Sequence, residues 1–278
     1  MAYKTLLTVL TREADVAPTL SAAADVAQRM DAHLEVLCLG LDRTQVGFYY
    51  AGASAVVFQE TLARAQEDAK ALDKAARDWL GRQTLRWGVE TAVTQVGALT
   101  DIVSLRARFS DLVIQPKPYG EDKALEDEAV VEAALFAGGA PVLVMPAEMP
   151  AAFGKRILVA WNQSAEAMVA IRRALPLLKE ADLVNVAIID PPQHGPERSD
   201  PGGALCQMLA RHGVRTEVSV LARTMPRISD VIIRHGRDIG ADMVVMGAYG
   251  HSRLRQAILG GATRNMLENT DLPVFMAH

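Results

Sequence analysis

Short runs of β-branched and other apolar residues alternate along the chain with longer segments in which apolar residues recur every three or four positions. The short runs are typical of strands in a parallel sheet, and the longer segments are typical of the helices that connect such strands. In the second half this pattern predicts strands at residues 156–161, 183–190, 214–222, 242–247 and 272–277. The hydrophobic pattern therefore predicts an α/β fold.

Helices are expected between these strands. One should begin near Ser164, a residue type that caps helix N-termini well, and another should cover residues 228–239. A short helix is expected to follow Thr263, and a long helix should cover residues 59–79 in the first half. Because crossovers between parallel strands are right-handed, each half should form an open, doubly wound sheet that binds ligands at the carboxyl ends of its strands.

The two halves of the chain resemble each other. Five segments recur in the same order: KTLLTVL as KRILVAW, LEVLCLGLD as LVNVAIID, GVETAVTQV as GVRTEVSVL, SDLVIQ as ADMVVM, and APVLVMP as LPVFMAH. Duplication explains this order better than chance, and the Pro- and Ala-rich stretch at residues 146–154 is typical of a linker. We therefore expect two domains, at residues 1–148 and 152–278, each built on a parallel, five-stranded, Rossmann-like sheet.

Composition narrows the class of protein. Half of the 278 residues are hydrophobic and 22% are charged, as in soluble globular proteins. The net charge of −4 argues against a non-specific nucleic-acid binder. No stretch is long and apolar enough for a membrane span, and the N-terminus lacks a signal-peptide pattern, so a cytoplasmic protein is expected. The histidines share no ligand spacing with one another or with Cys38 and Cys206, so no metal site is expected.

A glycine-containing loop follows the predicted strand at 242–247. Gly247 and Gly250 are three residues apart, Gly260 and Gly261 follow after nine intervening residues, and a helix is expected after them. Glycines let several backbone N–H groups point into one concavity, and a helix N-terminus adds further donors. Three arginines could offset phosphate charge: Arg253, Arg255 and Arg264. The loop therefore suits a polyphosphate, although no G-x-x-x-x-G-K-[ST] is present and no G-x-G-x-x-G follows the first strand.

The stretch VVMGAYGHSRLRQAILGGATRNMLENTDLPVFM resembles the closing third of a universal stress protein domain. ATP-binding members of that family carry a glycine, two residues, a glycine, nine residues, a glycine, and then Ser or Thr. The opening ILVAWNQSAEA resembles the family's first strand and loop, and the resemblance extends more faintly over the first half. It implies two domains of the adenine nucleotide alpha hydrolase-like type and ATP as the ligand, with Mg²⁺ as a candidate companion.

The resemblance also implies a set of contact residues in the second half. The adenosine end of ATP should contact Ala160, Trp161, Asn162 and Ile188. The phosphates should lie against Met246, Gly247, Tyr249, Gly250, Gly260, Gly261, Ala262 and Thr263, with Arg253 nearby. Two positions depart from the family pattern: the usual Asp is Asn162, and the usual Ser or Thr is Gly261. No side chain is placed as a general base, so no catalytic residue is expected.

The first half has lost the loop. Pro116 and Pro118 stand where glycines are expected, and proline lacks the N–H that would bind phosphate. Five acids follow that would repel a polyphosphate: Glu121, Asp122, Glu126, Asp127 and Glu128. The first domain is therefore expected to pack on the second as an intramolecular pseudo-dimer, with PVLVM and PVFMA as the contact, and the chain could pair further as a homodimer.

Three functions remain open. The leading one is a stress-response protein that binds ATP in its second domain and acts through conformation or partner choice. The alternatives are a slow ATPase or autophosphorylating protein, with Ser252 or Thr263 as acceptor, and a scaffold that binds no nucleotide.

Overall fold

The computed structural model describes residues 3–43, 55–148, 150, 152–191, 200–248 and 261–278. Contacts divide the chain into two compact units. The N-terminal unit comprises residues 2–118 and 122–140, and the C-terminal unit comprises residue 1 and residues 119–121 and 141–278. The predicted domain boundary after residue 148 was inferred from the recurring segments and not from contacts, and it stays a prediction.

The N-terminal unit contains four parallel strands in the order β3-β2-β1-β4. They are β1 (Thr5–Leu10), β2 (His33–Asp42), β3 (Arg86–Gln95) and β4 (Leu112–Pro116). Its described helices are α1 (Val16–Met30), α2 (Ala55–Leu80), α3 (Leu99–Ala107) and α4 (Leu125–Glu132), with short turns η1 (Glu13–Asp15), η2 (Val96–Ala98) and η3 (Ala133–Ala137). Leu6 of β1 lies in register with Leu34 on one side and Leu112 on the other.

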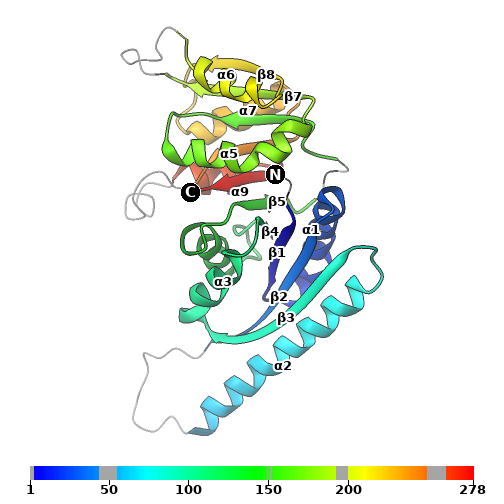
Figure 1. Cartoon of the computed structure of the whole chain (residues 1–278). Coiled ribbons are helices and arrows are strands. Elements are labelled where there is room, and N and C mark those ends of the chain that lie inside the picture. The colour runs from blue at the N-terminus through cyan, green and yellow to red at the C-terminus, as the bar shows by residue number, and fades with distance from the viewer. Residues whose placement is uncertain (1–2, 44–54, 149, 151, 192–199, 249–260) are drawn as a thin grey trace. The chain divides into compact units, whose positions relative to one another are not determined.

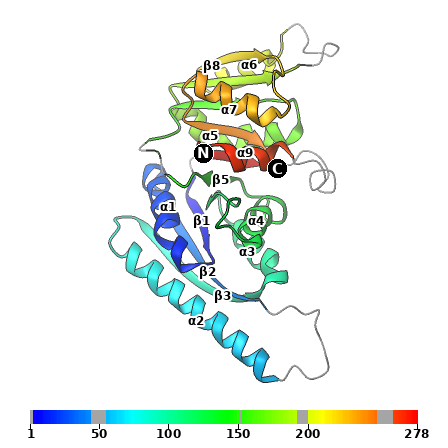
Figure 2. The ribbon, with the colours of Figure 1, turned by 180° about the vertical axis from the view of Figure 1, so that it is seen from behind.

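The C-terminal unit contains the strand order β5-β10-β9-β6-β7-β8. Its strands are β5 (Val142–Met145), β6 (Arg156–Ala160), β7 (Leu183–Ile189), β8 (Thr216–Leu221), β9 (Met243–Gly247) and β10 (Val274–Ala277). Its described helices are α5 (Ala165–Glu180), α6 (Gly203–Arg211), α7 (Ile228–Asp238) and α9 (Ala262–Asn269). Figure 1 shows α5 and α6 on one face of this sheet, and Figure 2 shows α7 and α9 on the other.

Burial explains why the central strands are continuous apolar runs. Helices cover both faces of the sheet, so every residue of β10 is buried and β6 and β9 are buried except at their ends. At the sheet edge this protection stops, and Val218 and Val220 of β8 are 42% and 55% exposed. The sheet centre therefore supplies a rigid base for residues that follow the strands.

The structure confirms the α/β fold with a mostly parallel sheet and all five strands predicted in the second half, within one or two residues at each end. It also confirms Ser164 as an N-cap, because its Oγ accepts a hydrogen bond from the backbone N–H of Ala167 at 3.1 Å. One prediction is shifted: the last helix begins at Ala262, before Thr263, with Gly261 as its N-cap.

Strand β5 departs from the predicted plan of five parallel strands in each half. It pairs antiparallel with β10, with Val144 opposite Val274 and Val142 opposite Met276, and contacts assign it to the C-terminal unit. These are the two strands, PVLVM and PVFMA, that the sequence names as a contact. The apolar side chains of β5 are buried by this arrangement.

None of the helices in the described ranges combines the length and the apolar composition needed to cross a membrane.

Candidate functional site

The carboxyl ends of three strands meet at the middle of the C-terminal sheet. Ala160, the last residue of β6, lies in register with Ala187 of β7 and with Met246 of β9. From β6 the chain winds outward to β7 and β8, whereas β9 and β10 lie on the opposite side of β6. The winding therefore reverses between β6 and β9, and such a switch point is where open α/β sheets form a ligand crevice.

Helix α9 begins at the same edge of the sheet. It leads into β10, which runs parallel to β9, so the start of α9 lies on the side of the strand carboxyl ends. Its N-cap, Gly261, makes no side-chain capping bond, and no acidic residue lies in its first turn. The positive end of this helix dipole is therefore not offset by a carboxylate of its own first turn.

Close packing against α5 requires a glycine at position 247. A Cβ built there would lie 2.5 Å from the backbone nitrogen of Ala167 and 2.7 Å from the carbonyl carbon of Glu166. Backbone atoms of a helix cannot give way as a flexible side chain can, so the first turn of α5 approaches β9 this closely only because residue 247 is glycine. The motif glycine thus brings the start of a second helix to the switch point.

Trp161 and Asn162 follow β6 directly. The backbone N–H of Trp161 donates to the carbonyl of Ala187 at 3.0 Å. Its side chain is buried, and its indole Nε1–H has no hydrogen-bond partner among the described residues. Asn162 is exposed, and its Oδ1 accepts from the backbone N–H of Ser164 at 3.1 Å. The side-chain oxygen of Asn162 is therefore used in a local turn, which leaves its amide N–H₂ as a neutral donor.

The other predicted contacts differ in exposure. The side chain of Ile188 is buried, and it packs so closely on Gly202 that a Cβ there would come within 2.8 Å of its Cδ1. Met246 and Thr263 are also buried, whereas Ala262 is exposed. Four predicted residues lie outside the described ranges: Tyr249, Gly250, Arg253 and Gly260.

Arg264, a candidate to offset phosphate charge, has other partners. Its guanidinium carbon lies 4.9 Å from the ring centroid of Tyr119, and its Nε donates to Glu268 at 2.8 Å. Tyr119 belongs to the C-terminal unit by its contacts. The charge of Arg264 is thus shared with a carboxylate one turn further along α9.

In the N-terminal unit the corresponding edge is closed by ion pairs. Arg12 and Arg43 follow β1 and β2, and they bind carboxylates of the first turn of α4: Arg12 lies 3.1 Å from Asp127, and Arg43 lies 2.6 Å from Glu126. Arg12 also pairs with Asp15 at 2.6 Å. The acids that were expected to repel a polyphosphate are therefore partly neutralised by arginines of the same unit.

Asp127 and Glu126 are well suited to this position. Asp127 accepts a hydrogen bond from the backbone N–H of Ala124 at 2.8 Å, so it caps α4 and pairs with Arg12 at once. Burial works to raise the pKa of Glu126, but the hydrogen bond from Arg43 and the charges of Arg43 and Arg12 outweigh it and hold that pKa below its ordinary value. The start of α4 thus carries fixed negative charge.

Side chains also bridge the switch point of the N-terminal unit. Thr8 of β1 donates to the carbonyl of Ile114 at 2.8 Å. When the side-chain amide of Gln115 is turned so that its oxygen faces a donor and its nitrogen faces an acceptor, the oxygen accepts from the Val9 N–H at 2.6 Å. The nitrogen then donates to the Val9 carbonyl at 3.3 Å. Thr8 and Gln115 are both buried, so polar side chains occupy the place where the second unit has a strand ladder.

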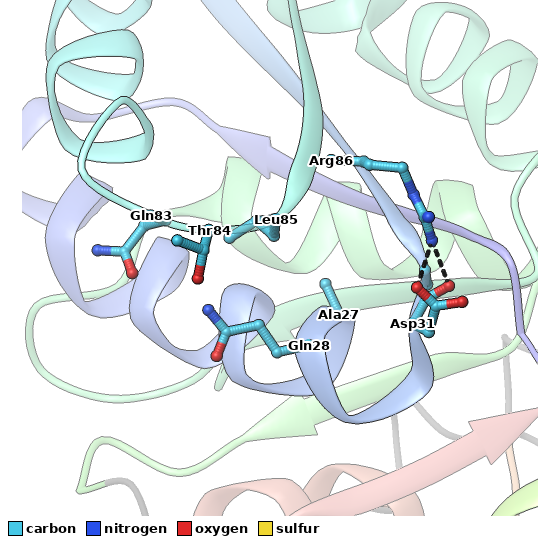
Figure 3. A pocket seen from close by; sticks show the side chains of 8 residues that line it. Ala27, Gln28, Asp31, Gln83, Thr84, Leu85 and Arg86 are labelled. Atoms are coloured by element: carbon cyan, nitrogen blue, oxygen red, sulfur yellow. Dashed lines mark hydrogen bonds and ion pairs between the residues drawn. The ribbon is translucent and has the colours of Figure 1, made fainter.

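A pocket of about 610 Å³ lies elsewhere in the N-terminal unit. Figure 3 shows it between the end of α1 and the turn before β3, with Gln28 facing Gln83 and Thr84 and with Asp31 joined to Arg86. Since β2 and β3 begin beside it, this pocket lies at the amino ends of the strands. It is therefore not the crevice that the sequence predicts.

Metal and thiol chemistry find little support in the described residues. Within the described ranges, no three His, Cys, Asp or Glu residues are grouped so that they could hold a metal ion. Burial raises the pKa of Cys38 to about 12, which keeps its thiol protonated and unreactive.

The comparisons with known proteins agree with this geometry. Residues 154–278 match the Universal stress protein family. The chain is also 27% identical over 135 residues to a universal stress protein of Synechocystis, which covers 48% of this chain and 45% of that relative. The match therefore spans less than half the length of that curated universal stress protein.

Solved structures extend the likeness in fold to the whole chain. A universal stress protein from Archaeoglobus fulgidus is similar with a TM-score of 0.69 and 16% identity, over 99% of this chain and 96% of that one. A putative universal stress protein from Pseudomonas aeruginosa is similar with a TM-score of 0.60 and 16% identity, over 99% and 93% of the two chains. At this identity the likeness shows the fold alone.

Sequence reasoning missed three features of these two edges. The pairing of Arg12 and Arg43 with the start of α4 was missed, although the two arginines follow closely on the recurring segments KTLLTVL and LEVLCLGLD. The close approach of α5 to Gly247 was missed because it depends on tertiary packing. The unpartnered indole N–H of Trp161 was missed because its burial could not be known from the sequence.

Proposed function

We propose that the chain is a tandem universal stress protein that binds ATP, with or without Mg²⁺, at the carboxyl edge of its C-terminal unit. One observation carries this proposal: α9 begins at that edge with neither a capping side chain nor an acid. A helix start of this kind favours a phosphate group, because the dipole and the first-turn N–H groups both attract anions. The family match over residues 154–278 supports the same assignment.

The N-terminal unit supports the tandem proposal by contrast. It has the same strand order around β1 as the C-terminal unit has around β6, but its edge is closed by the pairs of Arg12 and Arg43 with α4. We assign it no nucleotide. It acts as the pseudo-symmetric partner of the second domain, and the chain works in the cytoplasm in a stress response through nucleotide-dependent conformation or partner binding.

Gly261 offers the sharpest test of the nucleotide site. Its φ of −55° and ψ of 151° suit any residue, so a side chain can be added there without backbone strain. Gly261→Asp places a carboxylate at the helix start, as Asp127 does in α4, and should weaken ATP binding on the order of 100-fold by titration calorimetry while stabilising α9. Gly261→Ser adds a neutral cap and should keep the affinity within about 3-fold.

The two variants at Gly261 separate the effect of a negative charge on ATP binding from the effect of adding a side chain. Equal affinities of Gly261→Asp and Gly261→Ser for Mg-ATP would contradict phosphate binding at α9. The absence of any binding heat in the unmodified protein would remove ATP as the ligand and would leave a scaffold.

Binding and turnover are separated by ATP labelled at the γ-phosphate. The side chain of Thr263 is buried, which disfavours it as an accessible phosphate acceptor, and Ser252 lies outside the described residues. We therefore expect neither label retained on the protein nor fast release of labelled phosphate.

A further inference from the structure

The N-terminal unit contains a pocket of about 610 Å³ that has no role in the proposed function. Its volume lies within the ~300–1,000 Å³ that is typical of small-molecule sites. It lies between the end of α1 and the turn before β3, and all eight residues that line it belong to the described ranges (Figure 3). The side chains of the pocket therefore indicate which chemical class of ligand it suits.

Three neutral polar side chains face one another across this pocket. Gln28 of α1 faces Gln83 and Thr84 of the turn before β3 (Figure 3). No hydrogen bond joins these three side chains, and within the described ranges none of them has another side-chain partner. An amide donates and accepts hydrogen bonds at neighbouring atoms, and a hydroxyl group does both at one atom. Adjacent hydroxyl groups of a sugar offer the same combination, so this wall suits a diol.

An apolar side chain is open to the same pocket. Leu85 lines the pocket and is half-buried, and the next residue, Arg86, pairs with the first residue of β2. By the register of β7 with β8, the corresponding residue of the C-terminal unit is Val214, which is 4% exposed. The N-terminal unit thus keeps apolar surface beside its amides and hydroxyl. A sugar ring matches this arrangement, because C–H groups form its faces and hydroxyl groups form its edges.

The charged groups at the pocket are already paired. Arg86 donates to the carbonyl oxygen and to Oδ1 of Asp31 at 2.6 and 2.7 Å, and Lys4 donates to Oδ2 of Asp31 at 3.2 Å. The hydrogen bonds from Lys4 and Arg86 hold the pKa of Asp31 below its ordinary value, so this carboxylate stays charged at neutral pH. A charged ligand would have to compete with these pairs, whereas a neutral ligand leaves them in place.

We propose that this pocket binds a neutral sugar, with the amides of Gln28 and Gln83 and the hydroxyl of Thr84 on the hydroxyl edge of the ring. Leu85 then lies against the carbon face of the ring. The pair of Arg86 with Asp31 joins the turn to the end of α1, so both walls are in place before the ligand arrives. This site goes beyond the proposed function, because it gives a ligand to the unit to which we assign no nucleotide.

The direct test observes the side-chain amides in ¹⁵N spectra of the full chain, with the resonances assigned through Gln28→Ala and Gln83→Ala. Maltose, a neutral disaccharide, should shift both amides and reach half-saturation below about 10 mM. The double variant Gln28→Ala/Gln83→Ala should weaken maltose binding about 10-fold or more by calorimetry, as for two lost hydrogen bonds. Gln66→Ala removes an exposed glutamine of α2 and is the matched control, which should leave the affinity unchanged.

Glucose and glucuronate test the selection for a neutral ligand, because they share a ring and differ by one carboxylate. Glucose should bind more tightly, and equal or tighter binding of glucuronate would contradict the inference. Two further outcomes would overturn it: no saturable shift with either maltose or glucose, or unchanged maltose affinity in the double variant when its thermal unfolding matches that of the unmodified protein. Mg-ATP affinity should be the same in the double variant, so a failure of the sugar site leaves the proposed function standing.

Discussion

The starts of α4 and α9 occupy the same place in two copies of one topology, yet they present opposite charge. In α4 the first turn holds Glu126 and Asp127, which bind Arg43 and Arg12. In α9 the first turn contains no acid, and Gly261 caps it without a side chain. The N–H groups of a helix start attract negative charge. The start of α4 has carboxylates of its own, whereas the first turn of α9 has none, and this is the place that the proposed function gives to phosphate.

In the N-terminal unit, the absence of the motif glycines does not by itself explain why the edge of the sheet is closed. The prolines at 116 and 118 remove backbone donors, but they do not by themselves close the edge. The N-terminal edge is closed because arginines and carboxylates of the same unit neutralise one another and because Thr8 and Gln115 bridge β1 and β4. The N-terminal edge therefore differs from the C-terminal edge by its internal contacts as well as by its prolines.

The largest loss of stability is expected at Gly247, where a strand of the C-terminal unit packs directly on the backbone of a helix. Gly247→Ala places a Cβ against the backbone of α5 and should reduce the free energy of unfolding of the C-terminal unit by about 3 kcal/mol, measured by urea denaturation. Its counterpart in the N-terminal unit already carries a side chain, so Pro116→Ala should cost less than about 1 kcal/mol. Equal losses at both positions would contradict the close approach of α5.

The ion pairs of the N-terminal unit should give the next largest effect. Asp127→Asn removes the charge that pairs with Arg12 and leaves a neutral amide oxygen to accept from the Ala124 N–H, and should lower the free energy of unfolding of that unit by about 1–2 kcal/mol. Asp101 lies in the first turn of α3 and is exposed, so Asp101→Asn is a matched control that tests the helix dipole alone and should cost a few tenths of a kcal/mol. Indistinguishable losses would show that the pairing of α4 contributes nothing.

The two units should lose stability at different pH values when the solution is acidified. In the C-terminal unit, burial lowers the pKa of His235 below its ordinary value of 6.5, although the charge of Asp238 opposes the shift. The Nε2 of His235 lies 3.1 Å from Oδ1 of Asn185, whose amide in turn donates to Ser219. The unfolded chain therefore binds the proton more readily than the folded one.

Stability from His235 is thus fully present above pH 6.5 and is lost as the pH falls below that value, by less than about 1 kcal/mol. The fluorescence of Trp161 in the Trp79→Phe/Trp87→Phe variant follows this loss during denaturation between pH 7 and 5. His235→Gln should abolish the pH dependence in this window. In the N-terminal unit the lowered pKa of Glu126 keeps its contribution present until the pH falls below 4.5. The fluorescence of Trp79 and Trp87 in Trp161→Phe follows the N-terminal unit, and an equal loss of stability in both units between pH 7 and 5 would contradict this difference.

The sequence by itself determined the elements and their order. The β-branched runs and the helical periods predict strands and helices closely, because local burial on both faces of a sheet leaves a continuous apolar signature. It also determined the capping role of Ser164, which depends only on residues three apart, whereas the duplication and the phosphate-binding role of the glycine loop stay predictions.

Only the tertiary structure decided which chemistry each copy retains. The pairing of Arg12 with Asp127 joins residues 115 positions apart, and no local pattern specifies which carboxylate an arginine meets. The antiparallel pairing of β5 with β10 likewise joins segments that are far apart in the sequence, and no local pattern specifies their direction. The burial of Trp161, whose indole N–H has no partner within the described ranges, likewise depends on tertiary packing, because an unpartnered N–H is costly inside a protein and harmless in water.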